Sequence, residues 1–232
     1  MGETTIGSMS QGHPDVTRPL YSFAEADRLA KVTPNTSRRW LKGYHYWYSS
    51  TERRTLPPIT RRSEPIEEAV SFLDLMEVAA ISKLISKGFR LPIIRKINEV
   101  CRFYLHTSRP LVTEKFKVAG RDIFIDEGFG ILVNVRYEAG MQAWEEILRP
   151  FLEDVDYENE FVRRWWPLGK DHRVVVDPDY GFGLPVIAGT GVRTEIIAER
   201  SRAGDSEDEI VYDFGVNPEQ IHDALRYEGE AA

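Results

Sequence analysis

The sequence predicts an α+β fold with a helical front, a central β region and a helical rear. Three observations support it. Apolar residues recur every three or four positions in residues 21–44 and 65–105, the period of amphipathic helices. β-branched runs between glycine-containing breaks follow in residues 113–137, as in short strands. Glycine and cap residues then divide residues 194–225 into three further helices.

Length and composition set the class of protein. The 232 residues suffice for two modest domains with buried cores, and 42% hydrophobic with 29% charged residues is typical of a soluble globular protein. No apolar run of about 18 residues predicts a membrane span. The single cysteine, Cys101, excludes an internal disulfide framework, and no secretory signal opens the chain. We therefore expect a cytoplasmic protein, with residues 1–18 as a disordered tail.

Charge is strongly polarised along the chain. Residues 18–62 hold ten Lys and Arg against three Asp and Glu, whereas residues 111–232 hold 13 against 26. The net charge of −7 hides this contrast. A basic front is what a DNA-facing surface requires, because each neutralised phosphate releases counterions. The alternative is a chance cluster of solvated charges.

The front, residues 19–108, is predicted to open with two short helices. Phe23, Ala26 and Leu29 share one helical face, and Thr33 followed by Pro34 is expected to cap and start the second helix. This layout is that of a helix-turn-helix, in which the second helix faces a DNA groove. The alternative is a surface helix pair with a solvated face.

A β wing is expected to follow the second helix. Residues 44–48 are dense in strand-favouring aromatics, and a basic turn over residues 49–54 follows them. Helix and wing together supply the predicted DNA-binding residues, which are Thr33, Asn35, Thr36, Arg38, Arg39, Lys42, Tyr44, Arg53 and Arg54.

The segment YSFAEADRLAKVTPNTSRRW, with its run Arg38-Arg39-Trp40, resembles the DNA-binding half of MerR-type winged-helix regulators. The stretch SKLISKGFRLPIIRKI, where Gly88 breaks one helix and Pro92 opens the next, is similar to the second helix pair of those domains and extends the resemblance to about residue 105. The resemblance implies DNA binding. MerR-type sensors usually continue into a long coiled-coil helix, which is missing here, so their effector-sensing mechanism is not carried over.

Residues 109–172 are predicted to be an α/β connecting region. We expect a β-hairpin or meander over residues 113–137, beginning with a strand at residues 115–118, and one helix at residues 141–148. Further strands are expected at residues 161–168 and 173–176. The pair Trp165-Trp166 beside two arginines fits either a core edge with snorkelling cations or an anchor patch for a partner.

Residues 173–230 are predicted to form a helix-turn-helix-like unit of three helices after a short strand at residues 184–187. Thr194 is expected to cap the first helix, which runs to about residue 203, Asp205 or Ser206 caps the second, and Asn217 caps the third. The exposed side of this unit is acidic and repels phosphates, so we expect it to dock on a protein partner or on a second copy of the chain.

The run PVIAGTGV, RTEII, AGDSEDEIVYDFGVNPEQIHDAL closely resembles a small bacterial domain found in VapB-type antitoxins. Family members commonly carry Arg where this chain has Gly191. The resemblance implies an antitoxin of a type II toxin–antitoxin pair, which inhibits a PIN-type ribonuclease and represses the shared operon. An arginine fork suits the acidic metal pocket of such a toxin. The toxin-binding candidates are Arg163, Arg164, Trp165, Trp166 and Arg193.

No catalytic signature accompanies these motifs. The five histidines show no metal-ligand spacing, and no nucleophile elbow, P-loop or dinucleotide fingerprint occurs. We therefore predict a non-enzyme without metal or cofactor, a homodimeric antitoxin that binds operator DNA and a PIN-domain toxin. The alternatives are a MerR-like effector-sensing regulator without a toxin and a pure interaction scaffold.

Overall fold

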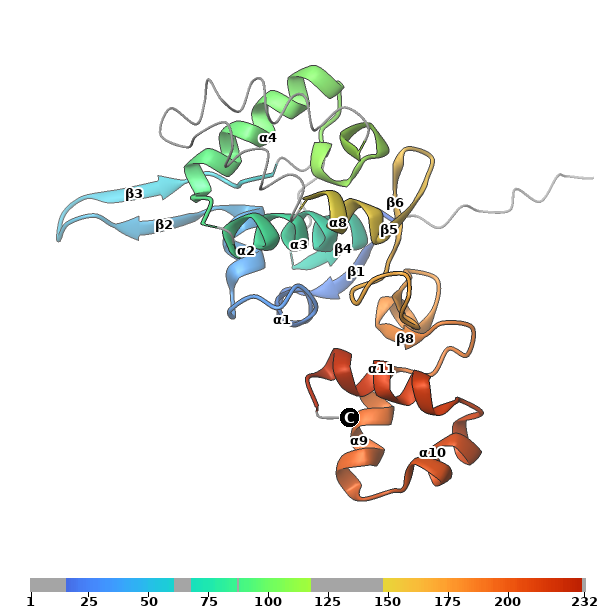
Figure 1. Cartoon of the computed structure of the whole chain (residues 1–232). Coiled ribbons are helices and arrows are strands. Elements are labelled where there is room, and N and C mark those ends of the chain that lie inside the picture. Colours follow the sequence, from blue (N-terminus) through green and yellow to red (C-terminus); the bar gives the residue numbers. More distant parts are fainter. Residues whose placement is uncertain (1–15, 61–67, 87, 118–147, 231–232) are drawn as a thin grey trace, which may run out of the picture.

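The computed structural model of the chain describes residues 16–60, 68–86, 88–117 and 148–230. It confirms the α+β class. The described residues form three antiparallel sheets, in which β1 pairs with β4, β2 pairs with β3, and β5 to β8 lie in sequence order. Figure 1 shows the β2–β3 hairpin protruding from the body at one side and the last three helices gathered at the C-terminal end.

The front begins with a strand that periodicity does not reveal. β1 (Pro19–Ser22) pairs with β4 (Ala69–Ser71), almost 50 residues later in the chain. Ser22 then caps α1 (Phe23–Leu29) in a capping box with Glu25. Val16, near the end of the predicted tail, packs against the front core, and the Leu73 amide donates to its carbonyl at 3.2 Å.

The second helix, α2 (Thr36–Lys42), begins later than predicted. The expected cap at Thr33 and start at Pro34 are wrong, because Asn35 adopts a left-handed conformation with φ of 65° and occupies the cap position. A tertiary contact fixes this start instead: the buried carboxylate of Asp27 on α1 accepts from the Ser37 amide at 2.7 Å. The helix pair itself is confirmed.

The predicted wing is confirmed as a hairpin of β2 (Tyr44–Trp47) and β3 (Arg53–Leu56). Arg53 and Arg54 lie on β3 rather than in the turn, which corrects the predicted basic turn. Gly43, between α2 and β2, has φ of 73°, and a Cβ there would meet the Leu56 carbonyl oxygen at 2.4 Å. Only glycine therefore lets the chain turn directly from helix into wing.

Two long helices form the centre of the front. α3 (Phe72–Ser86) is buried along most of its length, and α4 (Leu91–Leu105) follows with Pro92 in its first turn, as predicted. The short helix η1 (Pro110–Val112) packs against both. Arg109, just before it, donates to Asp74 at 2.7 Å and to Glu77 at 3.1 Å, and both carboxylates are fully buried.

Only the start of the predicted central β region lies within the described residues. Residues 114–117 are helical and Phe116 is fully buried, so the strand predicted at residues 115–118 is wrong at residues 115–117. The apolar alternation there is overridden by packing into the core. Residues 118–147, which hold the rest of the predicted hairpin or meander and nearly all of the predicted helix, lie outside the described residues.

The four-stranded sheet follows the short helix α8 (Arg149–Glu153). Its strands, in order, are β5 (Val155–Glu158), β6 (Phe161–Trp165), β7 (Val174–Val176) and β8 (Pro185–Ile187). The strands predicted at residues 161–168 and 173–176 are thus confirmed, with β6 ending earlier. One hydrophobic cluster runs from Tyr21 to Val176, so the predicted boundary between residues 108 and 109 crosses a continuous core.

The rear has its own cluster, which begins at Ile187. After the turn η4 (Gly181–Gly183), its helices are α9 (Thr194–Ala203), α10 (Glu207–Phe214) and α11 (Pro218–Glu228). Ser206 and Asn217 cap α10 and α11 through capping boxes, which confirms these two predicted starts. The predicted cap at Thr194 is wrong, because Arg193 occupies the cap position of α9 and the buried Thr194 hydroxyl donates to Glu228 instead. None of the described helices combines the length and apolarity needed to cross a membrane.

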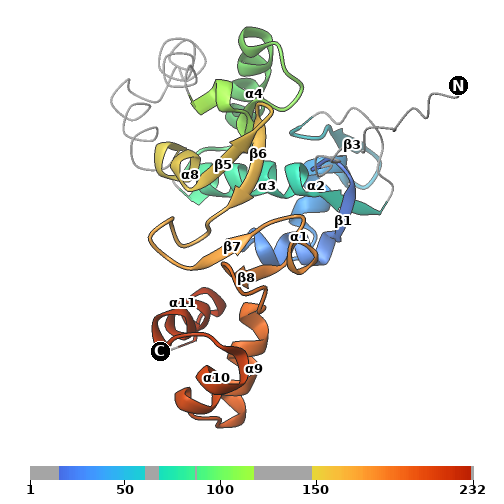
Figure 2. The ribbon, with the colours of Figure 1, turned by 90° about the vertical axis from the view of Figure 1, so that its right-hand side faces the viewer.

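Hydrogen bonds join the rear to the front. The Tyr21 hydroxyl donates to the Gly183 carbonyl at 2.8 Å, and the Lys31 ammonium donates to the Tyr227 carbonyl at 3.2 Å. Lys31 also lies 4.9 Å from the centroid of the Tyr227 ring. Figure 2 shows β7 and β8 between the front and the C-terminal helices. The rear therefore lies beside α1 of the front, and the wing protrudes from the front at a side away from the rear helices (Figure 1).

Candidate functional site

The outer side of α2 carries the predicted DNA-contacting residues. Ser37, Trp40 and Leu41 are buried and anchor the helix. The predicted residues at its start, Thr33 and Asn35, are exposed, whereas Thr36 is half-buried. α2 thus has the two-sided character that a groove-facing helix needs, with one apolar side inside and one polar side outside.

Two of the predicted cations share a carboxylate of the same chain. Arg38 binds Glu68 through both terminal nitrogens, and the Lys42 ammonium lies 3.4 Å from Glu68 Oε1. The hydrogen bond from Arg38 is the main cause that holds the pKa of Glu68 below its ordinary value. The Glu68 side chain is 69% exposed, and exposed ion pairs contribute little in water. A DNA phosphate can therefore take the place of this carboxylate.

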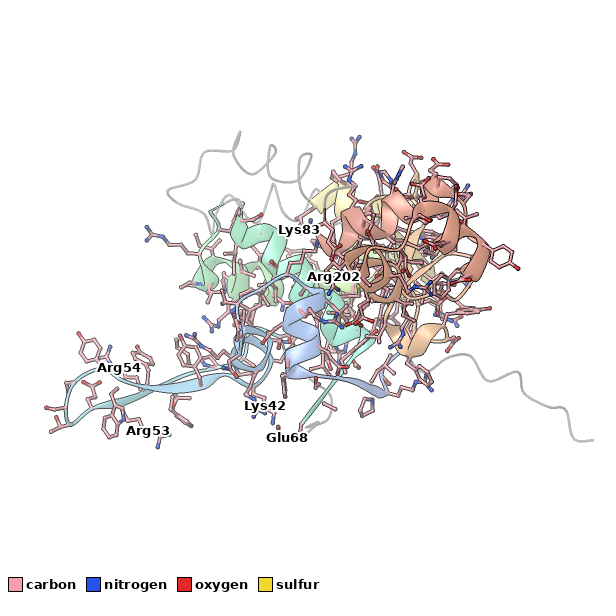
Figure 3. The ribbon with its side chains drawn as sticks, turned by 90° about the horizontal axis from the view of Figure 1, so that it is seen from below. Lys42, Arg53, Arg54, Glu68, Lys83 and Arg202 are labelled. Carbon is pink, nitrogen blue, oxygen red and sulfur yellow. The ribbon has the colours of Figure 1, made fainter. Side chains whose placement is uncertain are left out.

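Arg39 and Arg53 make no ion pair with a carboxylate among the residues that the structure describes. The Arg39 guanidinium lies 4.2 Å from the centroid of the Tyr44 ring, which holds it at the base of the wing. Arg53 pairs with Trp47 across the hairpin. Figure 3 shows Arg53 and Arg54 along the wing, with Lys42 beside Glu68 near its base.

Arg54 is more restrained than Arg53. Its guanidinium stacks 3.5 Å from the Tyr48 centroid, and its Nε donates to Glu52 at 2.7 Å. We call Thr33, Asn35, Thr36, Arg38, Arg39, Lys42, Tyr44, Arg53 and Arg54 the basic face. Its members, predicted from local sequence, all belong to α2, the turn before it and the wing.

The predicted toxin-binding residues divide into a buried pair, Arg163 and Trp165, and residues that are more exposed. The side chain of Arg163 is only 11% exposed and binds Asp177, Asp179 and Glu158. Trp165 is 6% exposed and belongs to the front core, which favours the core-edge interpretation for this tryptophan. These two residues have little surface left for a partner.

Arg164 and Trp166 face a pocket on the sheet of β6, β7 and β8. The pocket has a volume of about 440 Å³, and its walls are formed by Arg164, Trp166, Val175, Asp177, Tyr180, Val186 and residues 188–191. Val175 and Val186 are cross-strand partners and form an apolar floor. Arg193, the remaining predicted toxin-binding residue, is half-buried. Its backbone forms an isolated antiparallel β-bridge with Val186, which lines this pocket.

Asp177 organises the charged wall of the pocket. Its carboxylate accepts from Arg163 Nη1 at 2.6 Å, from Arg164 Nε at 2.5 Å and from the Asp179 amide at 2.9 Å. Burial opposes ionisation of Asp177, but these donors outweigh it and hold its pKa below the ordinary value. Arg164 therefore keeps its charge at this wall, with 45% of its side chain exposed.

Sequence reasoning missed most of the pocket. Tyr180 and residues 188–191, which line the pocket, carry no motif that points to a binding site. The floor depends on the register between β7 and β8, which no local pattern specifies. In the described part of the chain, no three His, Cys, Asp or Glu side chains are grouped to hold a metal ion.

Comparisons with known proteins place these surfaces in context. The family described as "Protein of unknown function (DUF433)" matches residues 174–227, which include β7, β8, α9, α10 and all but the last residue of α11. A Mycobacterium tuberculosis protein named "Putative antitoxin VapB45" is 27% identical over 89% of this chain and 92% of its own length. "Uncharacterized protein Rv2308" of the same organism is 25% identical over 90% of each chain.

A solved structure shares the fold. The crystal structure of Rv2018 from Mycobacterium tuberculosis matches with a TM-score of 0.67 and 21% identity, covering 90% of this chain and 98% of that chain. Both the front and the rear are therefore part of one shared architecture.

Proposed function

We propose that this protein is a DNA-binding antitoxin. It neutralises a PIN-type ribonuclease toxin and, as a homodimer in the cytoplasm, binds operator DNA to repress its own operon. The similarity to the antitoxin-named relative supports the proposal, because it runs along nearly the whole chain rather than the rear alone.

The basic face is the observation that carries the DNA-binding half of the proposal. A helix exposed on its polar side lies beside a protruding hairpin, and both carry arginines without carboxylate partners among the described residues. In a MerR-like winged helix, α2 would contact base edges in a groove, and the wing would contact the flanking phosphates. A dimer reads two half-sites and so multiplies affinity.

The toxin-binding half is supported by the outer arginines. Arg164 donates to Asp177 through Nε, which leaves its terminal nitrogens to form a fork with a carboxylate. Arg193 directly precedes α9, and its backbone pairs with Val186 of the same pocket. Arg163 is already bound to three carboxylates, so Arg164 is the better candidate to enter an acidic toxin site.

DNA binding is tested with fluorescently labelled DNA from upstream of the gene. The double variant Arg39→Ala/Arg53→Ala should lose affinity, and the slope of log affinity against log salt should fall by about two units, one for each lost phosphate contact. The control, Lys83→Ala/Arg202→Ala, removes the same charge from exposed sites outside the basic face, which Figure 3 labels. Equal loss in both double variants would contradict a specific DNA surface.

Toxin binding is tested by co-expressing the product of the adjacent reading frame. A PIN-type ribonuclease that copurifies with this chain and loses activity in the complex is the expected result. The absence of such a neighbour, or active nuclease in the complex, would refute the toxin-binding half and leave the DNA-binding half standing.

The pocket favours a second candidate, a MerR-like effector-sensing regulator without a toxin. Its volume of about 440 Å³ lies in the range of small-molecule sites. That candidate requires a small ligand that raises the melting temperature of the isolated chain and changes its affinity for DNA.

A further inference from the structure

The turn next to the sheet pocket displays an aromatic residue in an unusual backbone conformation. Phe182, on η4, has φ of 58° and ψ of 30°, and it is 85% exposed. Non-glycine residues seldom adopt this left-handed region, and a bulky aromatic has no local reason to do so. Tyr180, two residues earlier, lines the pocket and is also exposed.

The turn that presents Phe182 is fixed on both sides. A Cβ at Gly181 would meet Val186 Cγ1 at 2.4 Å, and one at Gly183 would meet the Tyr21 hydroxyl at 2.5 Å. The Gly183 carbonyl accepts from that same hydroxyl. The turn therefore packs against Val186 of β8 and against Tyr21 of the front, and these contacts fix the backbone that carries Phe182. Strained residues that the surroundings hold in place cluster at binding sites.

Two exposed aromatic residues lie at this pocket and next to it. Tyr180 lines the pocket together with Val175 and Val186, and Phe182 follows two residues later on the turn η4. A small ligand seated in the pocket would leave Phe182 in water. Rigid aromatic anchors around a pocket that accepts a side chain are instead typical of the centre of a protein–protein interface.

The rear helices indicate the charge of the partner. Residues 194–230 contain three Arg and no Lys against 11 Asp and Glu, and this acidic unit begins directly after the pocket loop of residues 188–191. Such a surface repels nucleic acid and attracts a positively charged protein patch.

We infer that the sheet pocket and the Tyr180–Phe182 rim form the main docking site for the protein partner. The partner inserts an aliphatic or aromatic side chain between the valine floor and Tyr180, packs against Phe182, and places a positively charged patch beside α9–α11. This inference rests on the proposed antitoxin function, and it assigns the binding energy to an aromatic rim rather than to the arginines alone.

The test uses the full chain and the purified product of the adjacent reading frame, with affinity measured by calorimetry. Phe182→Asn should weaken binding at least about tenfold, as expected for an interface anchor. The urea midpoint of the isolated chain should stay equal or rise, because asparagine tolerates positive φ better than phenylalanine. Loss of binding without loss of stability is a result that a merely structural Phe182 could not give.

A second variant and a control complete the experiment. Ala188→Leu places extra methyl groups in the pocket and should also weaken binding, whereas Phe103→Ala removes an aromatic of 73% exposure from α4 and should leave affinity unchanged. Wild-type affinity should fall as salt rises, because the rear helices contribute through charge.

Each contrary outcome has its own meaning. If the wild-type chain binds but Phe182→Asn and Ala188→Leu bind equally well, the inference is overturned and the proposed function stands. If the wild-type chain does not bind the neighbouring protein, the proposed function fails, and the inference fails with it. If Phe182→Asn instead dissociates a homodimer, the rim faces a second copy and the inference is likewise overturned.

Discussion

The helix pair α1–α2 and the rear helices α9–α11 solve a similar packing problem with opposite surfaces. Each unit packs short helices against an apolar core, which is the large front cluster for α1–α2 and a small separate cluster for the rear. Residues at positive φ join the helices, Lys31 and Asn35 in front and Gly204 and Gly215 in the rear. The basic face of the front suits phosphates, whereas the acidic rear repels them. The partner class therefore depends on the exposed side chains, not on the shared helix-turn-helix outline.

The two units also differ in what fixes their helix ends. α10 and α11 each start with a capping box and end at a left-handed glycine, so residues next to the helix ends determine where these helices begin and end. α2 has no side-chain cap, and contacts from α1 and from residue 59 determine its ends: the Ile59 amide donates to the Trp40 carbonyl at 2.7 Å. α2 therefore depends more heavily on tertiary contacts than α10 and α11 do, whereas α1 starts with a capping box of its own.

The largest expected effect comes from removing Arg109, a buried cation in the core of the front. Arg109→Met removes the cation that Asp74 and Glu77 share and leaves both carboxylates buried. Burial disfavours the charge of Arg109, yet Glu77 and Asp74 outweigh it and raise the pKa of Arg109. We expect a loss of about 3–5 kcal/mol in the free energy of unfolding, measured by urea denaturation. Arg202→Met, at an exposed ion pair, should change stability by at most about 1 kcal/mol.

A loss below about 1 kcal/mol for Arg109→Met would show that the two carboxylates find other partners or become protonated. In that case the front would depend on this ion cluster no more than the rear depends on its exposed pairs.

The same difference explains what the sequence could predict. The helices of the rear follow from Ser206, Asn217 and the glycines, since each signal acts within four residues. The pairing of β1 with β4 joins residues almost 50 positions apart, and no local pattern announces it. The helical start at residues 114–117 was missed because the burial of Phe116 in a distant core overrides its strand-like neighbours.

The candidate sites divide in the same way. The basic face could be assembled from sequence because α2 and the wing are adjacent in the chain. The contact of Arg38 and Lys42 with Glu68 could not, since Glu68 reaches them only through the position of β4. The pocket floor was missed for an equivalent reason: Val175 and Val186 meet across a strand register.

A pair of cap variants sharpens the comparison of helix starts. Ser206→Ala removes the side chain that accepts from the Glu209 amide at 3.3 Å and should cost about 1 kcal/mol in unfolding free energy. Asn35→Gly removes no side-chain cap and keeps the left-handed conformation, so stability should change by only a few tenths of a kcal/mol, roughly. Thermal or urea unfolding of both variants measures the difference, and equal losses would contradict it.

Single arginine variants test whether the basic face acts uniformly. Arg39→Ala should lower the slope of log affinity against log salt by about one unit, because Arg39 has no carboxylate partner among the described residues. Arg38→Ala should lower it by less, since Arg38 must first leave Glu68. Titrations of operator DNA at several salt concentrations measure both slopes. A larger effect from Arg38 would reverse the assigned roles.

The smallest expected effect comes from Glu68→Gln, which removes the carboxylate that competes with phosphates for Arg38 and Lys42. Affinity for DNA should rise only a few-fold, roughly, because an exposed pair contributes little. The pKa of Glu68 lies below its reference value of 4.5, chiefly through the hydrogen bond from Arg38. The ion pair is therefore intact above that value and is lost only as the pH falls through the lowered pKa. The ratio of variant to wild-type affinity should stay constant from about pH 6 to pH 8, whereas a ratio that shrinks toward pH 6 would show that Glu68 already takes up a proton there.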